Sequence, residues 1–321
     1  MSCLSVKDLQ VTFTIQKRKA AAVSGVSFEL GDTRTLGIVG ESGCGKSITA
    51  LSIMRLIPSP PGKIESGKIH FGQKELLSLS EKEMCGVRGK SISMIFQDPM
   101  TSLNPVFTCG NQIAEVLRLH KGMSVKEAAA LGTELLSEVG IAEPNRAWSS
   151  YPHQLSGGMR QRIMIAMALS CSPKLLIADE PTTALDVTVQ AKLLELLKKL
   201  QNSKNMSMIL ITHNLGIVAD MAHDVIVMYA GEVMESAPSQ TLFDSPRHPY
   251  TACLLKTIPT VEKRAERLTV IPGSVPTILD IPDGCPFHPR CPQALERCKT
   301  EHPSLHSVDG GKHYVRCHHC E

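Results

Sequence analysis

Short apolar runs alternate with helical patterns along most of the chain. Runs rich in apolar residues occur at 36–39, 92–96, 175–178 and 208–211, and their length is typical of buried strands. Between the last two runs, residues 189–197 repeat apolar positions at the spacing of an amphipathic helix. Alternation of this kind predicts a mostly parallel sheet covered by helices, and therefore an α/β fold.

The same pattern divides the chain into three parts. From residue 98 to 156 it becomes helical, with apolar positions on one face, and beyond residue 248 it is rich in proline and loses its period. We therefore predict an α/β core made of residues 1–97 and 157–247, a helical subdomain at 98–156, and a small loop-rich extension at 248–321.

Composition and charge limit the classes of partner that are expected for this chain. The chain has 321 residues, 42% of them hydrophobic, and a formal charge of +3 from 34 basic and 31 acidic residues. No basic block of the kind that binds a phosphate backbone occurs, so nucleic acid is not expected as a partner. The first residues lack a signal-peptide pattern, and no apolar run approaches the roughly 18 residues of a membrane span. We expect a cytosolic protein that reaches a membrane by docking.

The first chemical motif lies at residues 40–47, directly after an apolar run, and reads GESGCGKS. Glycines at this spacing let backbone N–H groups surround a phosphate at the start of a helix. A lysine there binds the β- and γ-phosphates, and the following hydroxyl binds Mg²⁺. A chance glycine-rich turn is the alternative, made improbable by the strand before it. The predicted binding residues are Gly40, Ser42, Gly43, Gly45, Lys46 and Ser47.

A second phosphate-handling element is predicted at residues 175–180, LLIADE. A buried strand of this kind would place Asp179 near the metal and Glu180 beside the γ-phosphate, where a carboxylate polarises the attacking water. A surface turn is the alternative when this segment is considered alone. Its pairing with the GESGCGKS motif favours the catalytic interpretation.

A third motif, LSGGMRQ at residues 155–161, precedes an apolar-periodic run. Ser156, Gly157 and Gly158 would begin a helix whose free N–H groups form another anion site. A flexible linker is the alternative, because Ser and Gly are common in linkers.

Together the three motifs resemble those of ABC ATPases, over residues 4 to 233. The resemblance implies an ABC-type P-loop ATPase with a RecA-like core, a helical subdomain and, here, a small cysteine-rich C-terminal appendage. It also implies that the segment 155–161, the signature of the family, contacts the γ-phosphate of ATP held by a second subunit.

Further positions resemble the family residue by residue. Gln97 resembles the glutamine that contacts the metal or water, Asp186 belongs to a segment at 184–186 that resembles the D-loop, and His213 resembles the histidine that contacts the γ-phosphate. Phe13 is the candidate for stacking on adenine, although a core strand position explains it equally well. The Mg²⁺ ligands implied in this way are Ser47, Gln97 and Asp179.

Three further segments, at 96–105, 151–154 and 247–251, indicate which branch of the ABC family the chain resembles. They resemble the ATP-binding subunits of dipeptide and oligopeptide permeases, whose relatives also import nickel and metal chelates. The implied function is ATP hydrolysis that energises peptide import, with a nickel or chelate importer as the alternative. The implied partners are a second, paralogous ATPase subunit, two membrane permease subunits and an extracytoplasmic substrate-binding protein, at the cytoplasmic face of the inner membrane.

Cysteines and histidines gather at the end of the chain. Five of eleven cysteines and six of twelve histidines lie at 285–321, where metal ligands would be sought. The spacing of the first four cysteines does not choose a metal, and unligated thiols are an alternative. The permease branch implies a structural [4Fe–4S] cluster, with zinc as the alternative, and little apolar core is expected around it. The candidate ligands are Cys285, Cys291, Cys298 and Cys317.

Two rival functions remain at this point. A non-transport ABC ATPase of DNA repair or translation would share the three motifs, but tandem cassettes, a coiled-coil insertion and a basic surface are not visible in the sequence. An iron–sulfur sensor that binds ATP without hydrolysing it is the other rival. The transported substrate and the identity of the second cassette are not readable from this chain.

Overall fold

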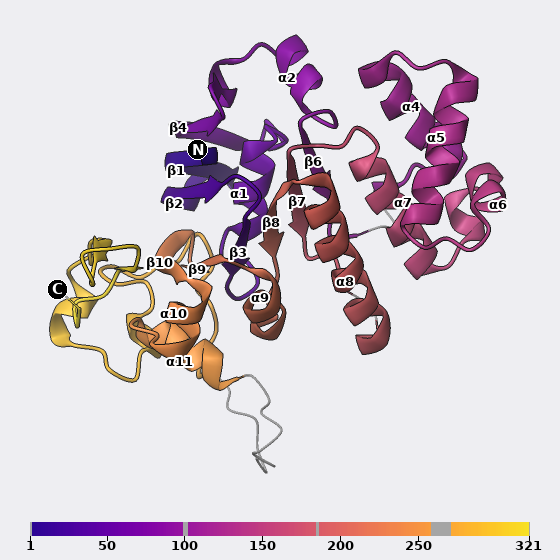
Figure 1. Cartoon of the computed structure of the whole chain (residues 1–321). Coiled ribbons are helices and arrows are strands. Elements are labelled where there is room, and N and C mark those ends of the chain that lie inside the picture. Colours follow the sequence, from indigo (N-terminus) through magenta and orange to yellow (C-terminus); the bar gives the residue numbers. More distant parts are fainter. Residues whose placement is uncertain (1, 99–101, 184–185, 258–270, 321) are drawn as a thin grey trace. The chain divides into compact units, whose positions relative to one another are not determined.

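The computed structural model describes residues 2–98, 102–183, 186–257 and 271–320 (Figure 1). It contains two compact units, one made of residues 1–77 and 210–321 and the other of residues 78–209. We describe each unit by itself.

The first unit begins with an antiparallel sheet in the order β2-β1-β4-β5. Its strands are β1 (Ser2–Ile15), β2 (Arg18–Gly31), β4 (Gly62–Phe71) and β5 (Lys74–Glu75). Apolar residues of β1, among them Leu4, Val6, Leu9 and Val11, are buried, and β1 lies between β2 and β4. Because β1 is interrupted by irregularities of register against both neighbours, its alternation is not regular enough to be recognised in the sequence.

The same unit contains strands in the order β11-β12-β10-β9-β3. They are β3 (Thr35–Val39), β9 (Asp224–Tyr229), β10 (Glu232–Pro238), β11 (His306–Ser307) and β12 (Tyr314–Val315). The fully buried β3 pairs in parallel with β9, whereas β10 is antiparallel to β9. The sheet is therefore mixed, and its parallel part carries the GESGCGKS motif at the end of β3.

Short helices complete the first unit. They are α1 (Lys46–Ile53), α9 (Leu215–Met221), α10 (Ser239–Asp244) and α11 (Pro249–Lys256), with 3₁₀ turns η1 (Leu76–Ser78), η3 (His288–Arg290) and η4 (Glu296–Lys299). Strand β8 (Ser207–Ile211) crosses the boundary between the two units.

The second unit combines buried strands with helices. Strands β6 (Ile92–Ile95) and β7 (Leu175–Asp179) pair in parallel. The helices are α2 (Glu81–Val87), α4 (Cys109–Lys121), α5 (Val125–Glu138), α6 (Pro144–Ser149), α7 (Gly157–Leu169) and α8 (Val187–Lys204), with the 3₁₀ turn η2 (Pro152–Gln154). Local sequence explains where they begin: Ser124 and Glu127 form a capping box at α5, and the Thr108 hydroxyl caps α4.

Trp148 of α6 holds this helical part together. A Cβ atom built on Gly132 of α5 would lie 2.0 Å from its ring, and one on Gly110 of α4 would lie 2.4 Å from it. The two glycines therefore leave the space that the indole fills.

We expect Gly132→Ala to lower the free energy of unfolding by about 1–3 kcal/mol, the usual cost of overpacking a core. Denaturant titration followed by the fluorescence of Trp148, the single tryptophan, measures this; a wild-type midpoint would contradict it.

The predicted strands are confirmed as β3, β6, β7 and β8, and the predicted helical stretch contains α4, α5 and α6. The antiparallel sheet at the start of the chain was not predicted. The two compact units do not follow the boundaries of the three predicted parts, and the three-part division stays a prediction.

The expectation that the extension has little core is wrong. Tyr250 and Phe287 are fully buried and pack on Tyr229 of β9, with ring centroids 4.8 and 5.3 Å from that of Tyr229. Cys285 and Cys298 belong to the same apolar cluster. The core was missed because its aromatic residues lie far apart in the sequence, between prolines that hide any period.

Candidate functional site

The GESGCGKS motif forms the connection between β3 and α1. Gly40 has φ of 149°, and a Cβ atom there would lie 2.2 Å from the carbonyl oxygen of Met228. Gly45, the N-cap of α1, has φ of 99°, and a Cβ atom there would lie 2.7 Å from the carbonyl oxygen of Ala22. Only glycine satisfies both conditions. Ser42 and Gly43, at the tip of the loop, are exposed, so the backbone there is accessible to a phosphate.

Lys46 is the buried cation of this loop. Its side chain donates hydrogen bonds to the carbonyl oxygens of Gly40 (2.8 Å) and Glu41 (2.9 Å) and lies 3.6 Å from the Cys44 sulfur. Burial raises the pKa of the Cys44 thiol, against the opposing effect of the Lys46 ammonium. The thiol is therefore neutral near pH 7, and the positive charge of Lys46 remains available to a phosphate. Ser47 follows in the first turn of α1.

The acidic pair lies at the end of β7. All five residues of this strand are buried, and Asp179 is 4% exposed. Glu180 follows with φ of 45°, a left-handed conformation that is uncommon for residues other than glycine and is often found at functional sites.

Two neighbours of the second unit hold the Glu180 carboxylate. Its Oε2 accepts hydrogen bonds from the Gln97 amide nitrogen at 3.1 Å and from the Thr183 hydroxyl at 2.9 Å. The structure thus brings together two predicted residues, Gln97 and Glu180, that lie 83 positions apart. Thr183 was not predicted; a hydroxyl three residues after a candidate base is the signal that could have found it.

The signature residues form an accessible helix terminus. Ser156 is the N-cap of α7, and its hydroxyl accepts a hydrogen bond from Met159 N at 3.3 Å. Ser156 and Gly157 are exposed, and a Cβ atom on Gly157 or Gly158 would have no neighbour within 4 Å. The terminus of this 13-residue helix therefore leaves room for an anion from outside the chain.

For the remaining predicted site residues, the structure gives only their exposure and local contacts. His213 is exposed, just after β8 and before the N-cap of α9. Asp186 is the N-cap of α8 and accepts a hydrogen bond from Val189 N at 2.9 Å, while 184–185, the rest of the predicted D-loop, lie outside the described residues. Phe13 is half-buried on β1, and its ring lies over Gly62. The roles predicted for these three stay predictions.

The four predicted cluster cysteines lie in the first unit. Cys285, Cys298 and Cys317 are buried and Cys291 is partly exposed. Burial raises the pKa of Cys285 to about 11 and that of Cys317 to about 12, with smaller contributions from repulsion by the neighbouring thiolates. Among the residues that the structure describes, no group of three or more His, Cys, Asp or Glu could hold a metal ion. Neither the predicted [4Fe–4S] cluster nor the zinc alternative is therefore supported by such a group, and both stay predictions.

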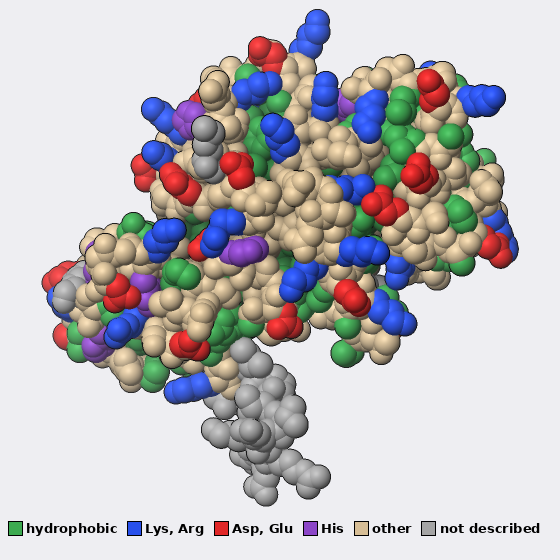
Figure 2. All heavy atoms as spheres, in the orientation of Figure 1, with side chains coloured by type: hydrophobic (Ala, Val, Ile, Leu, Met, Phe, Trp, Pro, Cys, Tyr) green, Lys and Arg blue, Asp and Glu red, His purple; other side chains and the backbone are tan. Residues whose placement is uncertain are grey.

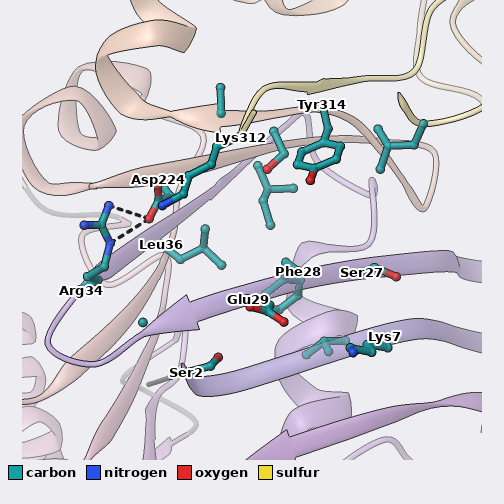
Figure 3. A pocket seen from close by; sticks show the side chains of 16 residues that line it. Ser2, Lys7, Ser27, Phe28, Glu29, Arg34, Leu36, Asp224, Lys312 and Tyr314 are labelled. Carbon is teal, nitrogen blue, oxygen red and sulfur yellow. Dashed lines mark hydrogen bonds and ion pairs between the residues drawn. The ribbon is translucent and has the colours of Figure 1, made fainter. Parts of the chain in front are cut away.

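A separate pocket of about 670 Å³ occurs in the first unit (Figure 3). It is lined by Leu36, the second residue of β3, and by Asp224, the first residue of β9, so it lies at the opposite end of these parallel strands from the GESGCGKS loop. Arg34 donates two hydrogen bonds to Asp224 Oδ2 at its edge, at 3.0 and 2.8 Å. The pocket contains none of the predicted site residues.

On the described part of the face drawn in Figure 2, basic and acidic side chains are intermixed. Among the described residues, no helix combines the length and the apolar character needed to cross a membrane.

Comparison with protein families gives two matches in one chain. The family model described as "ABC transporter" matches residues 23–183. A model described as "Oligopeptide/dipeptide transporter, C-terminal region" matches residues 234–298, which include three of the four predicted cluster cysteines.

Similar proteins span nearly the whole chain. The oligopeptide transport ATP-binding protein AppD of Bacillus subtilis is 53% identical over 314 residues, which are 98% of this chain and 95% of AppD. The dipeptide transport ATP-binding protein DppD of Escherichia coli is 48% identical over 318 residues, 99% of this chain and 97% of DppD. Among solved structures, the dimeric ATP-binding cassette MJ0796 bound to ADP and Pi is 27% identical, with a TM-score of 0.66 over 74% of this chain and 98% of that one.

Proposed function

Because the chain belongs to the ABC transporter family of ATP-binding proteins, we propose that it is the ATP-hydrolysing subunit that energises import of dipeptides and oligopeptides. The observation that carries the substrate class is the combination, in one chain, of the ABC transporter match at 23–183 with the oligopeptide/dipeptide match at 234–298. Full-length similarity to AppD and DppD supports the same conclusion.

The loop after β3 binds the phosphates of ATP in this proposal. Lys46 exchanges its hydrogen bonds with loop carbonyls for phosphate oxygens, and backbone N–H groups at the start of α1 surround the β-phosphate. Mg²⁺ neutralises charge on the transferred phosphate; the residues that would hold it are Ser47, Asp179 and Gln97.

Glu180 is the group that polarises the attacking water. Its carboxylate is oriented by Gln97 and Thr183, and a positioned carboxylate of this kind accelerates a proton transfer. His213 contacts the γ-phosphate, and Phe13 stacks on adenine. These roles rest on the family resemblance together with the local geometry.

A second cassette supplies the rest of the site. The exposed terminus of α7 at Ser156, Gly157 and Gly158 fits a phosphate held by a partner subunit, and Asp186 belongs to the segment that resembles the family's D-loop. The dimeric structure of the similar cassette MJ0796 supports a paired working unit. The other partners are two membrane permease subunits and an extracytoplasmic substrate-binding protein, at the cytoplasmic face of the membrane.

The extension holds a [4Fe–4S] cluster in this proposal, on Cys285, Cys291, Cys298 and Cys317. The support is the family resemblance together with the placement of all four cysteines in the first unit, three of them buried. Anaerobic purification followed by iron and sulfide counts tests this; about four irons per chain, lost in Cys291→Ser, are expected, and zinc or no metal would overturn it.

Transport by the purified complex tests the main proposal. The chain is expected to copurify with two apolar membrane subunits, and proteoliposomes that contain the complex and its binding protein should accumulate labelled dipeptide only with Mg²⁺ and ATP. Accumulation of labelled nickel without dipeptide would support the metal importer instead. If the chain hydrolyses ATP but no membrane subunit copurifies with it, the result would indicate a non-transport ATPase. If it binds ATP without hydrolysing it, the result would indicate a sensor.

A further inference from the structure

Arg290 of the C-terminal extension reaches the phosphate-binding loop. Its guanidinium donates to both carboxylate oxygens of Glu41, the second residue of the loop, at 2.7 and 3.0 Å. The two residues are 249 positions apart, and the Arg290 side chain is only 5% exposed. A two-pronged contact of this kind fixes orientation as well as distance.

The guanidinium is held from all sides. Besides Glu41, it donates to the carbonyl oxygen of Pro272 at 2.8 Å, to the Tyr229 hydroxyl at 3.3 Å and to the carbonyl oxygen of Ile271 at 3.5 Å. These bonds use the five donors that an arginine possesses. Arg290 is therefore a fixed point of the extension, and Glu41 is the side chain that it holds.

A second residue of the extension holds the backbone of Glu41. The Tyr250 hydroxyl accepts a hydrogen bond from Glu41 N at 3.0 Å, and Tyr250 is itself fully buried against Tyr229 and Phe287. Side chain and main chain of Glu41 are thus both tied to the extension, by two residues, Arg290 and Tyr250, that lie outside the ATP motifs.

Glu41 connects these ties to Lys46. Its carbonyl oxygen accepts the 2.9 Å hydrogen bond from the Lys46 ammonium. A shift of Glu41 would therefore move an acceptor that places the phosphate-binding cation. In addition, the Glu41 carboxylate belongs to the loop that is to bind a triphosphate, and without Arg290 its negative charge would be uncompensated.

We propose that Arg290 and Glu41 form a positioning pair through which the C-terminal extension sets the affinity of the phosphate-binding loop for ATP. This inference rests on the proposed ATP-binding function. It adds that the extension is part of the nucleotide site rather than a separate appendage.

The test measures binding of ATP to the full chain by calorimetry. Arg290→Gln is expected to weaken ATP binding about tenfold, because it removes charge-assisted hydrogen bonds and leaves the carboxylate uncompensated. Arg290→Gln combined with Glu41→Gln should recover part of that affinity, since the uncompensated charge is gone although the two-bond contact that orients the loop is still missing. A role confined to stability would give no recovery, because the double variant also lacks the ion pair.

Arg34→Gln is the matched control. It removes a two-bond arginine–carboxylate pair, Arg34 to Asp224, from the same unit but at the pocket in Figure 3, and should leave ATP affinity within about twofold. If Arg290→Gln does not fold, Arg290→Lys keeps the charge but not the fork, and should weaken ATP binding several-fold.

Three outcomes are decisive. Wild-type ATP affinity in folded Arg290→Gln or Arg290→Lys would overturn the proposal, and so would a double variant that binds no better than the single one. Failure of the wild-type chain to bind ATP would instead overturn the proposed function itself.

Discussion

Glu180→Gln is expected to lower the rate of Mg²⁺-dependent ATP hydrolysis about 10²- to 10⁴-fold while ATP binding is retained. The substitution keeps the size of the side chain, and the amide oxygen can still accept the hydrogen bonds from Gln97 and Thr183. It removes the negative charge and the basicity on which polarisation of the attacking water depends. Single-turnover hydrolysis and equilibrium ATP binding, measured on the same preparation, separate the two effects.

Glu195→Gln supplies the control for this change. Glu195 is an exposed carboxylate on α8 of the same unit, and its neutralisation should leave both measurements unchanged. Undiminished hydrolysis in Glu180→Gln would remove Glu180 from the role of base. A parallel loss of ATP binding would show that the residue acts mainly in holding the nucleotide.

Local sequence was sufficient to predict the elements that are formed by one continuous stretch of residues. The apolar runs that became β3, β6, β7 and β8 are buried along their length, so their composition alone identifies them. The GESGCGKS loop could be predicted for a similar reason, because the conformations of Gly40 and Gly45 exclude other residues.

Features that depend on distant partners could not be predicted. Strand β1 pairs with β4, from Phe13 with Gly62 to Leu4 with Phe71, through an irregular register, so the pattern of β1 alone does not identify it as a strand. The ion pair between Glu41 and Arg290 joins residues 249 positions apart, and the sequence around either residue does not predict the contact. Thr183 was missed because its contact with Glu180 depends on the left-handed turn at Glu180.

Gly158→Asp should abolish most hydrolysis, with a loss of about 10²-fold or more, because a carboxylate at the start of α7 would repel the phosphate that the partner subunit presents. The chain itself should fold normally. A Cβ atom at Gly158 meets nothing within 4 Å, and an acidic residue in the first turn of a helix is favourable. Binding of ATP to the loop after β3 should be unchanged.

Gly158→Asn separates charge from shape, since it has the same size as Gly158→Asp without the negative charge. We expect hydrolysis by this variant to lie much closer to wild type. Equal losses in the two variants would mean that the terminus of α7 tolerates no side chain and would remove the electrostatic argument. Full activity in Gly158→Asp would show that no phosphate approaches α7, and the paired-cassette proposal would then lose its structural support in this chain.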